Sequence, residues 1–197
     1  VLISKLGYIK RVPLTQYQAQ SRGGKGSLSA TLIEGDYINQ IFTATTKSYI
    51  TFFTNEGKVY WIKVHEIPEA SRSSRGSSIK SLIQLNPDEE ISTIVTMSDY
   101  RDDEYIFMAT ANGIVKKCVT TEFANAKTRG VIGIKLRDGD KLVSAIMTSG
   151  KDDLMLITRR GQALRLNEES VRPMGRASSG VTGIRISTGD ELAAALR

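Results

Sequence analysis

A repeat of about fifty residues runs through the whole chain and limits the folds it can adopt. Each unit opens with an apolar run, a glycine and a second apolar run, which together predict a β-hairpin whose turn needs positive φ. These first glycines are Gly7, Gly57, Gly113 and Gly161. A second glycine follows 17 or 19 residues later, at Gly26, Gly76, Gly130 and Gly180. Because a fixed period decides an architecture before any single motif does, we predict a repeat protein.

Each unit has the strand content of one propeller blade. Apolar residues, an acidic turn and a closing apolar run follow the second glycine, so that a unit offers about four short strands. The acidic residues of these turns are Asp36, Asp88, Asp140 and Asp190. We therefore expect an all-β, propeller-like domain of about four four-stranded blades over residues 1–197, with repeats at approximately 1–46, 47–100, 101–149 and 150–197.

The composition excludes several classes of protein. With 40% hydrophobic residues among 197, the chain has enough apolar side chains for a core, and its single Cys118 permits no internal disulfide. No apolar stretch approaches the roughly 18 residues that a membrane span needs, so we expect no membrane partner. One histidine, His65, and one cysteine are too few for a zinc tetrad and leave little for a nucleophile and its base. We therefore predict neither catalytic residues nor a metal site.

The basic residues follow the repeat. The chain has 27 Lys and Arg against 21 Asp and Glu, a net charge of +6 that favours a polyanionic partner. One group of cations lies near the second glycines, at Arg72, Arg75, Lys127, Arg129 and Arg176. Another group follows the first glycines, at Lys10, Arg11, Lys58, Lys63, Lys116, Lys117 and Arg165. If the units radiate around an axis, equivalent loops share one rim, which would contact phosphates without reading bases. The alternative is that these charges only solubilise exposed loops.

The first unit carries the sharpest motif, Gln20-Ser21-Arg22-Gly23-Gly24-Lys25-Gly26. Three glycines and two cations make a loop whose backbone N–H groups can approach a phosphate closely. The Walker A spacing is absent, so the motif does not support nucleotide hydrolysis. A flexible RNA-binding segment would repeat such motifs in a disordered region, whereas this one stands once, inside a predicted folded repeat.

This motif resembles the seven-residue box of the C-terminal domain of bacterial DNA gyrase A subunits, which usually reads Gln-Arg-Arg-Gly-Gly-Lys-Gly. Ser21 departs from that pattern and removes one cation. Segments such as Gly57-Lys58-Val59-Tyr60 and Thr182-Gly183-Ile184-Arg185 are similar to the blade signatures of the same family. The resemblance extends over essentially the whole chain.

The resemblance implies a β-pinwheel, in which neighbouring blades exchange strands and double-stranded DNA wraps around a basic outer edge. It assigns the DNA-binding box to Gln20, Arg22, Gly23, Gly24, Lys25 and Gly26. In such a protein this domain enables negative supercoiling without a cofactor of its own, and the parent enzyme uses ATP and Mg elsewhere. The implied partners are the rest of the gyrase A protein and the gyrase B protein in a heterotetramer, in the bacterial cytoplasm and associated with the nucleoid.

Two alternatives remain open. The related domain of topoisomerase IV lacks a well-formed box, and a β-propeller scaffold would bind acidic proteins at the same rim. The family's disc normally has six blades against the four units counted here, so we expect a fragment. Four blades could form a closed ring or an open arc with exposed strand edges.

Overall fold

The fold is all-β, as expected: the computed structural model describes residues 1–197 and contains fifteen strands and five 3-10 turns but no α-helix. The first sheet contains β1 (Leu2–Ser4), β2 (Tyr8–Lys10), β3 (Ile38–Ile41) and β6 (Ser77–Ser78). The second contains β4 (Tyr49–Thr54), β5 (Lys58–Lys63), β7 (Ile91–Met97) and β10 (Val131–Ile132). The third contains β8 (Tyr105–Thr110), β9 (Ile114–Val119), β11 (Leu142–Thr148) and β14 (Val181–Thr182). The fourth contains β12 (Asp153–Thr158), β13 (Ala163–Asn167) and β15 (Leu192–Leu196).

Short 3-10 turns connect the strands. They are η1 (Leu14–Gln16), η2 (Val64–Glu66), η3 (Ile79–Ser81), η4 (Thr120–Phe123) and η5 (Glu168–Ser170). All but η3 come after the hairpin of a unit and before its second glycine. These four turn the chain from the hairpin into the long connection that contains the second glycine.

Neighbouring units exchange strands. The two-residue strands β6, β10 and β14 follow the second glycines of units two, three and four, and each pairs with the hairpin of the preceding unit. Val131, for example, lies opposite Val59 in an antiparallel register. The expected four-stranded blade is therefore completed by the next unit along the chain. The fourth sheet has three strands, and the segment after the second glycine of the first unit forms no strand.

Close backbone approach explains one glycine position. All eight repeat glycines have positive φ, as the hairpin and loop turns predict. At Gly57 the next unit also packs against the turn: the carbonyl oxygen of Gly57 accepts hydrogen bonds from the N–H groups of Gly133 and Ile134, at 2.8 and 3.1 Å. A Cβ on Gly57 would lie 2.6 Å from the carbonyl oxygen of Ile134. Only glycine allows this fit.

The core lies between sheets, in three clusters of buried apolar residues for four sheets. The two faces of one strand serve different clusters, since successive side chains point to opposite sides of a sheet. Phe52 packs between the first and second sheets, whereas Phe53 packs between the second and third. A sheet covered on both faces explains why the strands read as continuous apolar runs rather than as an alternation.

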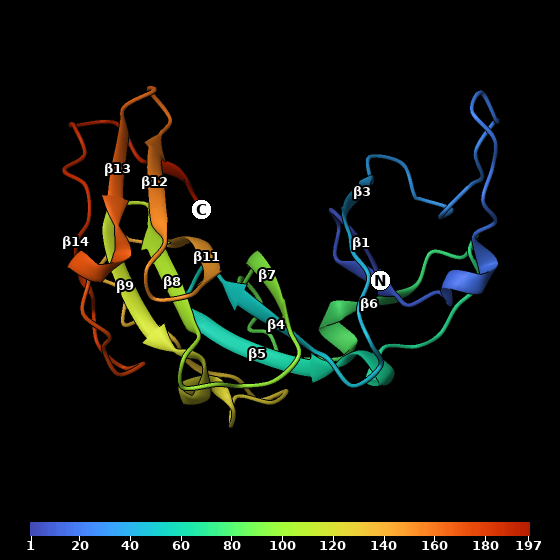
Figure 1. Cartoon of the computed structure of the whole chain (residues 1–197), viewed down its shortest axis with the longest axis horizontal. Coiled ribbons are helices and arrows are strands. Elements are labelled where there is room, and N and C mark those ends of the chain that lie inside the picture. The colour runs from blue at the N-terminus through green and yellow to red at the C-terminus, as the bar shows by residue number, and fades with distance from the viewer.

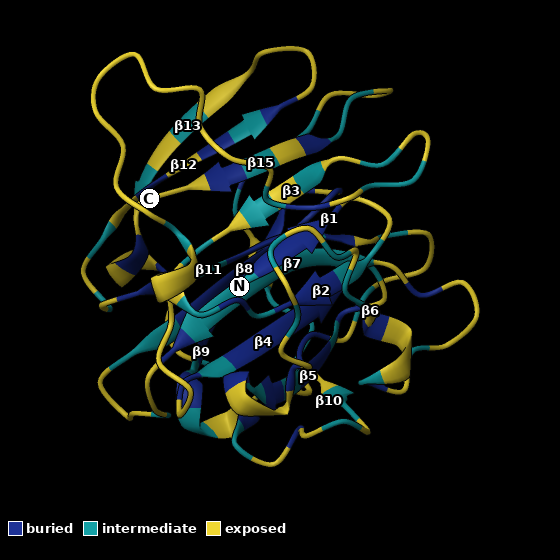
Figure 2. Ribbon diagram, turned by 90° about the vertical axis from the view of Figure 1, so that its right-hand side faces the viewer, coloured by how far each residue is buried: buried dark blue, intermediate teal, exposed yellow.

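The sheets follow one another along an open arc, from the first sheet at the right to the fourth at the upper left (Figure 1). The closing strand β11 contacts both β7 and β15, which places these three strands on the inner side. The exchanged strands β6, β10 and β14 stand at the opposite end of each sheet order. Buried residues concentrate in the stacked strands and exposed residues in the loops around them (Figure 2).

The acidic turns cap the hairpins. One carboxylate oxygen of Asp140 accepts hydrogen bonds from the N–H groups of Asn112 and Lys141, at 3.0 and 2.9 Å. Asp36 and Asp190 make the equivalent pairs of contacts in the first and fourth units. These carboxylates are therefore used within the fold, at the hairpin tips.

Candidate nucleic-acid interface

The segments that contain the second glycines form a continuous edge. We call them the outer loops, residues 20–26, 71–76, 127–130 and 176–180. The chain that leaves each of the first three outer loops hydrogen-bonds to the next one. Thr31 donates its N–H to the carbonyl of Ser73 at 2.8 Å, Gln84 to that of Thr128 at 2.9 Å, and Lys135 to that of Ser178 at 3.0 Å. The repeat thus joins four short basic segments into one surface.

The first outer loop is closed by its own glutamine. The Gln20 side chain accepts a hydrogen bond from the N–H of Gly26 at 2.8 Å and donates one to its carbonyl at 3.3 Å. A tight turn lies within this clamp, because Gly24 donates its N–H to the carbonyl of Ser21 at 3.0 Å. A Cβ on Gly24 would lie 2.7 Å from the Gln20 side-chain oxygen. The clamp gives Gln20 and the glycines a structural reason to occur together.

The two cations of this loop point outward. Arg22 and Lys25 are exposed, and neither takes part in an ion pair. In Figure 1 the loop projects from the right-hand end of the arc, in the blue part of the chain. The arrangement presents two unneutralised cations beside a glycine-rich backbone, which suits a phosphate group.

The cations of the other outer loops are also without ion-pair partners: Arg72, Arg75, Lys127, Arg129 and Arg176. Arg75, Lys127 and Arg129 are exposed, and Arg72 and Arg176 are half-buried. The Arg75 guanidinium lies over the Tyr8 ring, 5.5 Å from its centroid. Arg72 donates to the carbonyl of Gln16 at 3.4 Å, which links the second outer loop to the first unit.

Three of the predicted rim cations are not on the surface, and their placement is corrected. Lys10, Lys116 and Lys117 are buried, with 1%, 0% and 3% of their surface exposed. Lys117 donates to the backbone carbonyl of Glu168 at 2.8 Å, and its ammonium lies 3.8 Å from the carboxylate of the same residue. Lys10 and Lys116 bind backbone carbonyls of the outer loops. Their charges compensate internal polar groups and cannot touch a phosphate in this structure.

Two further cations of the same group are neutralised by neighbours. Arg11 forms an ion pair with Glu69 at 2.6 Å and donates to the carbonyl of Ile67 at 2.8 Å. Arg165 is exposed but is paired with Asp153. Lys58 is also ion-paired, with Glu56, whereas Lys63 has no ion pair and its ammonium lies 5.0 Å from the centroid of the Tyr49 ring. Six of the seven predicted cations that follow the first glycines are thus buried or ion-paired, whereas those near the second glycines form no ion pair.

Sequence reasoning missed a set of exposed cations on the segments that follow the outer loops: Lys80, Lys135, Arg137 and Arg185. None of them forms an ion pair. The available signal is their recurrence, since Lys80, Lys135 and Arg185 each lie four or five residues after a second glycine. They widen the basic edge along the chain.

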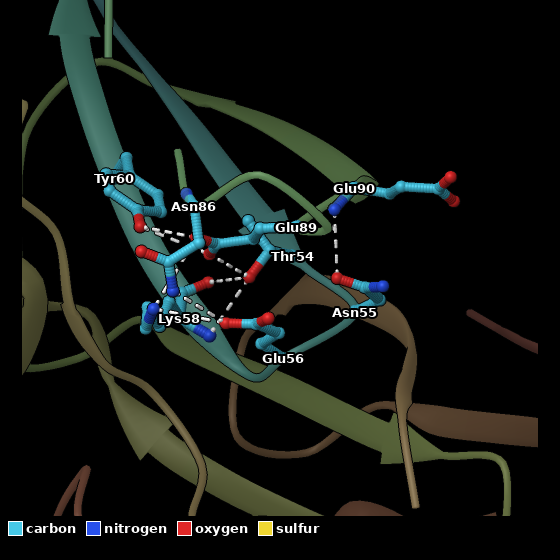
Figure 3. Close-up of polar contacts among 8 residues, drawn as sticks. All are labelled: Thr54, Asn55, Glu56, Lys58, Tyr60, Asn86, Glu89 and Glu90. Atoms are coloured by element: carbon cyan, nitrogen blue, oxygen red, sulfur yellow. Dashed lines mark hydrogen bonds and ion pairs between the residues drawn. The ribbon is translucent and has the colours of Figure 1, made fainter. Parts of the chain in front are cut away.

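The acidic side chain of Glu89 is buried and does not reach the basic edge. Glu89 is 1% exposed and accepts hydrogen bonds from the hydroxyls of Thr54 and Tyr60, at 2.6 and 2.9 Å, and from the N–H of Asn86 at 3.0 Å (Figure 3). Burial raises the pKa of Glu89, but these donors and the Lys58 ammonium outweigh it and hold the pKa below the ordinary value. The carboxylate is therefore charged but enclosed, and it does not face an anionic ligand.

No group of three or more His, Cys, Asp or Glu side chains is placed to hold a metal ion. None of the helical turns is long and apolar enough to cross a membrane.

Known proteins resemble this chain in sequence and in structure. The family model described as the DNA gyrase C-terminal domain, beta-propeller, matches residues 1–45, 48–96, 104–149 and 152–197. The DNA gyrase A protein of Treponema pallidum is 55% identical over 179 residues, covering 91% of this chain and 22% of that protein. The chain therefore spans less than a quarter of this relative's length.

Solved structures give the same picture. A DNA gyrase A C-terminal domain superposes with a TM-score of 0.76 at 33% identity, over 98% of this chain and 62% of the other. The C-terminal domain of a DNA topoisomerase IV superposes with a TM-score of 0.83 at 28% identity, over 98% of this chain and 59% of the other. Four repeats matched by one model, on exchanged-strand sheets with a clamped glycine-rich box, place the chain in the DNA gyrase C-terminal domain, beta-propeller family.

Proposed function

We propose that this domain binds duplex DNA along its outer loops and bends it around the arc. The observation that carries the proposal is the division of the cations. Of the seven that follow the first glycines, six are buried or ion-paired, whereas the seven in the outer loops have no ion-pair partner: Arg22, Lys25, Arg72, Arg75, Lys127, Arg129 and Arg176. Charges that only solubilised the surface would not be sorted by position in the repeat.

The number of free cations sets the expected strength of binding. If each contacts one phosphate, the seven contacts give a slope of about −6 in log K against log [salt], at roughly 0.9 per contact. Bending a duplex of 20–30 base pairs costs on the order of 1–6 kcal/mol. Phosphate contacts spaced along the arc offset that cost, because a straight duplex would reach fewer loops.

We further propose that the domain acts within a bacterial DNA gyrase, together with the rest of the gyrase A protein and with the gyrase B protein. The support is the sequence identity to gyrase A subunits and the intact Arg22 to Gly26 segment. Bent DNA would present a nearby duplex for strand passage, so that the enzyme introduces negative supercoils. Cleavage, ATP and Mg belong in this proposal to other parts of the enzyme, which acts on cytoplasmic, nucleoid-associated DNA.

Binding is tested by titrating a duplex of about 40 base pairs with the full chain at several salt concentrations, in a filter-binding or mobility-shift assay. We expect affinity to fall steeply with salt and to depend little on base sequence. Absent binding, or binding insensitive to salt, would overturn the proposal. Competition by acidic proteins but not by DNA would favour the scaffold alternative.

The box is tested in a reconstituted gyrase whose A protein ends in this domain. The double substitution Arg22→Ala and Lys25→Ala is expected to abolish supercoiling and to leave relaxation unchanged. Arg165→Ala is the matched control, because that arginine is also exposed but is paired with Asp153. Unchanged supercoiling by the box variant would refute its role in wrapping.

A further inference from the structure

Two buried lysines hold the same position in alternate units. Lys10 and Lys116 are each the third residue after a first glycine, on β2 and β9. They are 1% and 0% exposed, and neither ammonium has a carboxylate partner. A buried charge without a counter-ion is costly unless polar groups converge on it.

The converging groups are backbone carbonyls, five of the six from the next unit. The Lys10 ammonium donates to the carbonyls of Ser71, Arg72 and Ser74, at 3.2, 2.6 and 2.7 Å. All three N–H donors of the lysine are thereby used. Every acceptor lies in the second outer loop, so that three carbonyl groups of this loop converge on one ammonium.

Lys116 repeats the arrangement two units later. Its ammonium donates to the carbonyls of Gly133 at 2.8 Å and Ser178 at 3.2 Å, and to that of Arg176. Two of these acceptors lie in the fourth outer loop. Burial lowers the pKa of both lysines, that of Lys116 to about 8.

The loops held in this way carry free cations. The carbonyls of Arg72 and Arg176 bind the buried ammoniums, while their guanidinium groups remain without an ion pair. In the first sheet the same strand face also supports Arg75, because Tyr8 lies two residues before Lys10 and its ring lies beneath the Arg75 guanidinium.

The second sheet offers an internal comparison. Its equivalent residue is Tyr60, whose hydroxyl donates to Glu89 and not to an outer loop. The third outer loop is instead attached by its backbone, since the carbonyl of Lys127 accepts a hydrogen bond from the N–H of Trp61 at 3.1 Å. Removal of the polar group at this position therefore tests stability without releasing a loop.

We propose that Lys10 and Lys116 are positioning residues for DNA binding: each gathers the carbonyls of the next unit's outer loop and so fixes the arginines of that loop where they meet the phosphate backbone. The inference rests on the proposed function. It assigns a DNA-binding effect to lysines that DNA cannot reach.

The first test compares Lys10→Met and Lys116→Met with the wild-type chain in the salt titration. We expect the slope of log K against log [salt] for Lys10→Met to be smaller in magnitude than the wild-type slope by about 2, as for loss of two phosphate contacts. It should match the slope of the double variant Arg72→Ala, Arg75→Ala. Tyr60→Phe is the control, with an unchanged slope. A Lys10→Met slope equal to the wild-type value would overturn the proposal.

A double-mutant cycle separates positioning from general stability. Added to Arg72→Ala, Arg75→Ala, the Lys10→Met substitution should cause no further loss of affinity, because the arginines that it places are absent. A further loss of the same fold as in the wild-type background would refute the proposal. If wild-type chain fails to bind DNA, the proposed function itself fails.

Amide hydrogen exchange gives a readout that does not need DNA. Residues 71–76 should exchange faster in Lys10→Met, with the second and third sheets unchanged. If Lys10→Met does not fold, Lys10→Gln takes its place, since its amide keeps two N–H donors and loses the charge. Wild-type exchange of residues 71–76 in the folded variant would contradict the positioning role.

Discussion

Strand exchange makes a testable distinction between glycines that look equivalent in the sequence. Gly57 and Gly161 both occupy the hairpin turn of their unit, with φ of +75° and +87°. A Cβ on Gly161 would meet nothing within 4 Å, whereas one on Gly57 would lie 2.6 Å from the carbonyl oxygen and 2.9 Å from the Cγ2 of Ile134. The substitutions Gly57→Ala and Gly161→Ala thus share the backbone strain and differ in the contact with the next unit.

The two costs follow from these contacts. Forcing alanine into the left-handed region costs roughly 1–2 kcal/mol in either variant. At Gly57 the clash also displaces the segment after β10, weakening two backbone hydrogen bonds to the Gly57 carbonyl. Overpacking of this kind costs about 1–3 kcal/mol more. We therefore expect a loss of about 2–5 kcal/mol for Gly57→Ala and about 1–2 kcal/mol for Gly161→Ala.

The free energy of unfolding is measured by urea denaturation, followed by circular dichroism, with amide exchange of residues 131–134 as a local probe. Gly57→Ala should accelerate exchange there, and Gly161→Ala should not. Equal losses of stability in the two variants, with slow exchange retained at residues 131–134, would refute the argument that pairing of the exchanged strand requires a turn residue without a side chain.

Further predictions concern charge and the box. Because the pKa of Glu89 is lowered in the folded state, its carboxylate stabilises the fold fully above the unfolded pKa, near 4.5, and this stabilisation is lost as the pH falls through the lower folded pKa. The free energy of unfolding, measured by urea denaturation at pH 3–6, should therefore depend less steeply on pH in Glu89→Gln than in the wild-type chain. Arg129→Ala should lower the salt slope of DNA binding by about 1, while Arg165→Ala, already paired, should change it less. Gln20→Ala removes both hydrogen bonds to Gly26, so amide exchange in residues 20–26 should accelerate and DNA affinity should fall; unchanged exchange would contradict the clamp.

Local features are predictable because backbone conformation depends on nearby residues. The glycine period predicts the hairpins, and positive φ at all eight glycines confirms it. Pattern alone does not assign the last strand of each sheet to its hairpin, since nothing in a segment such as Val131–Ile132 says which hairpin it joins. The exchange of strands follows only from the family resemblance, and the sheet order confirms it.

Burial of the lysines depends on distant partners. Lys10 binds carbonyls 61 to 64 residues away, which no local pattern reveals. One clue is present in the repeat: the position of Lys10 and Lys116 is held by Tyr60 and Leu164 in the other units, which is typical of a packed site. Reasoning from charge alone predicts that these lysines lie on the rim, because an ammonium is rarely buried without a carboxylate partner.

The exchanged strands also determine how the molecule should unfold. The first three sheets are each finished by residues that lie a full repeat further along the chain, so one repeat does not make an independent folding unit. Stability then depends on couplings between nearest neighbours, as in linear repeat proteins. Damage to a single hairpin turn is expected to loosen two adjacent sheets together, and opening should spread from repeat to repeat rather than remain within one.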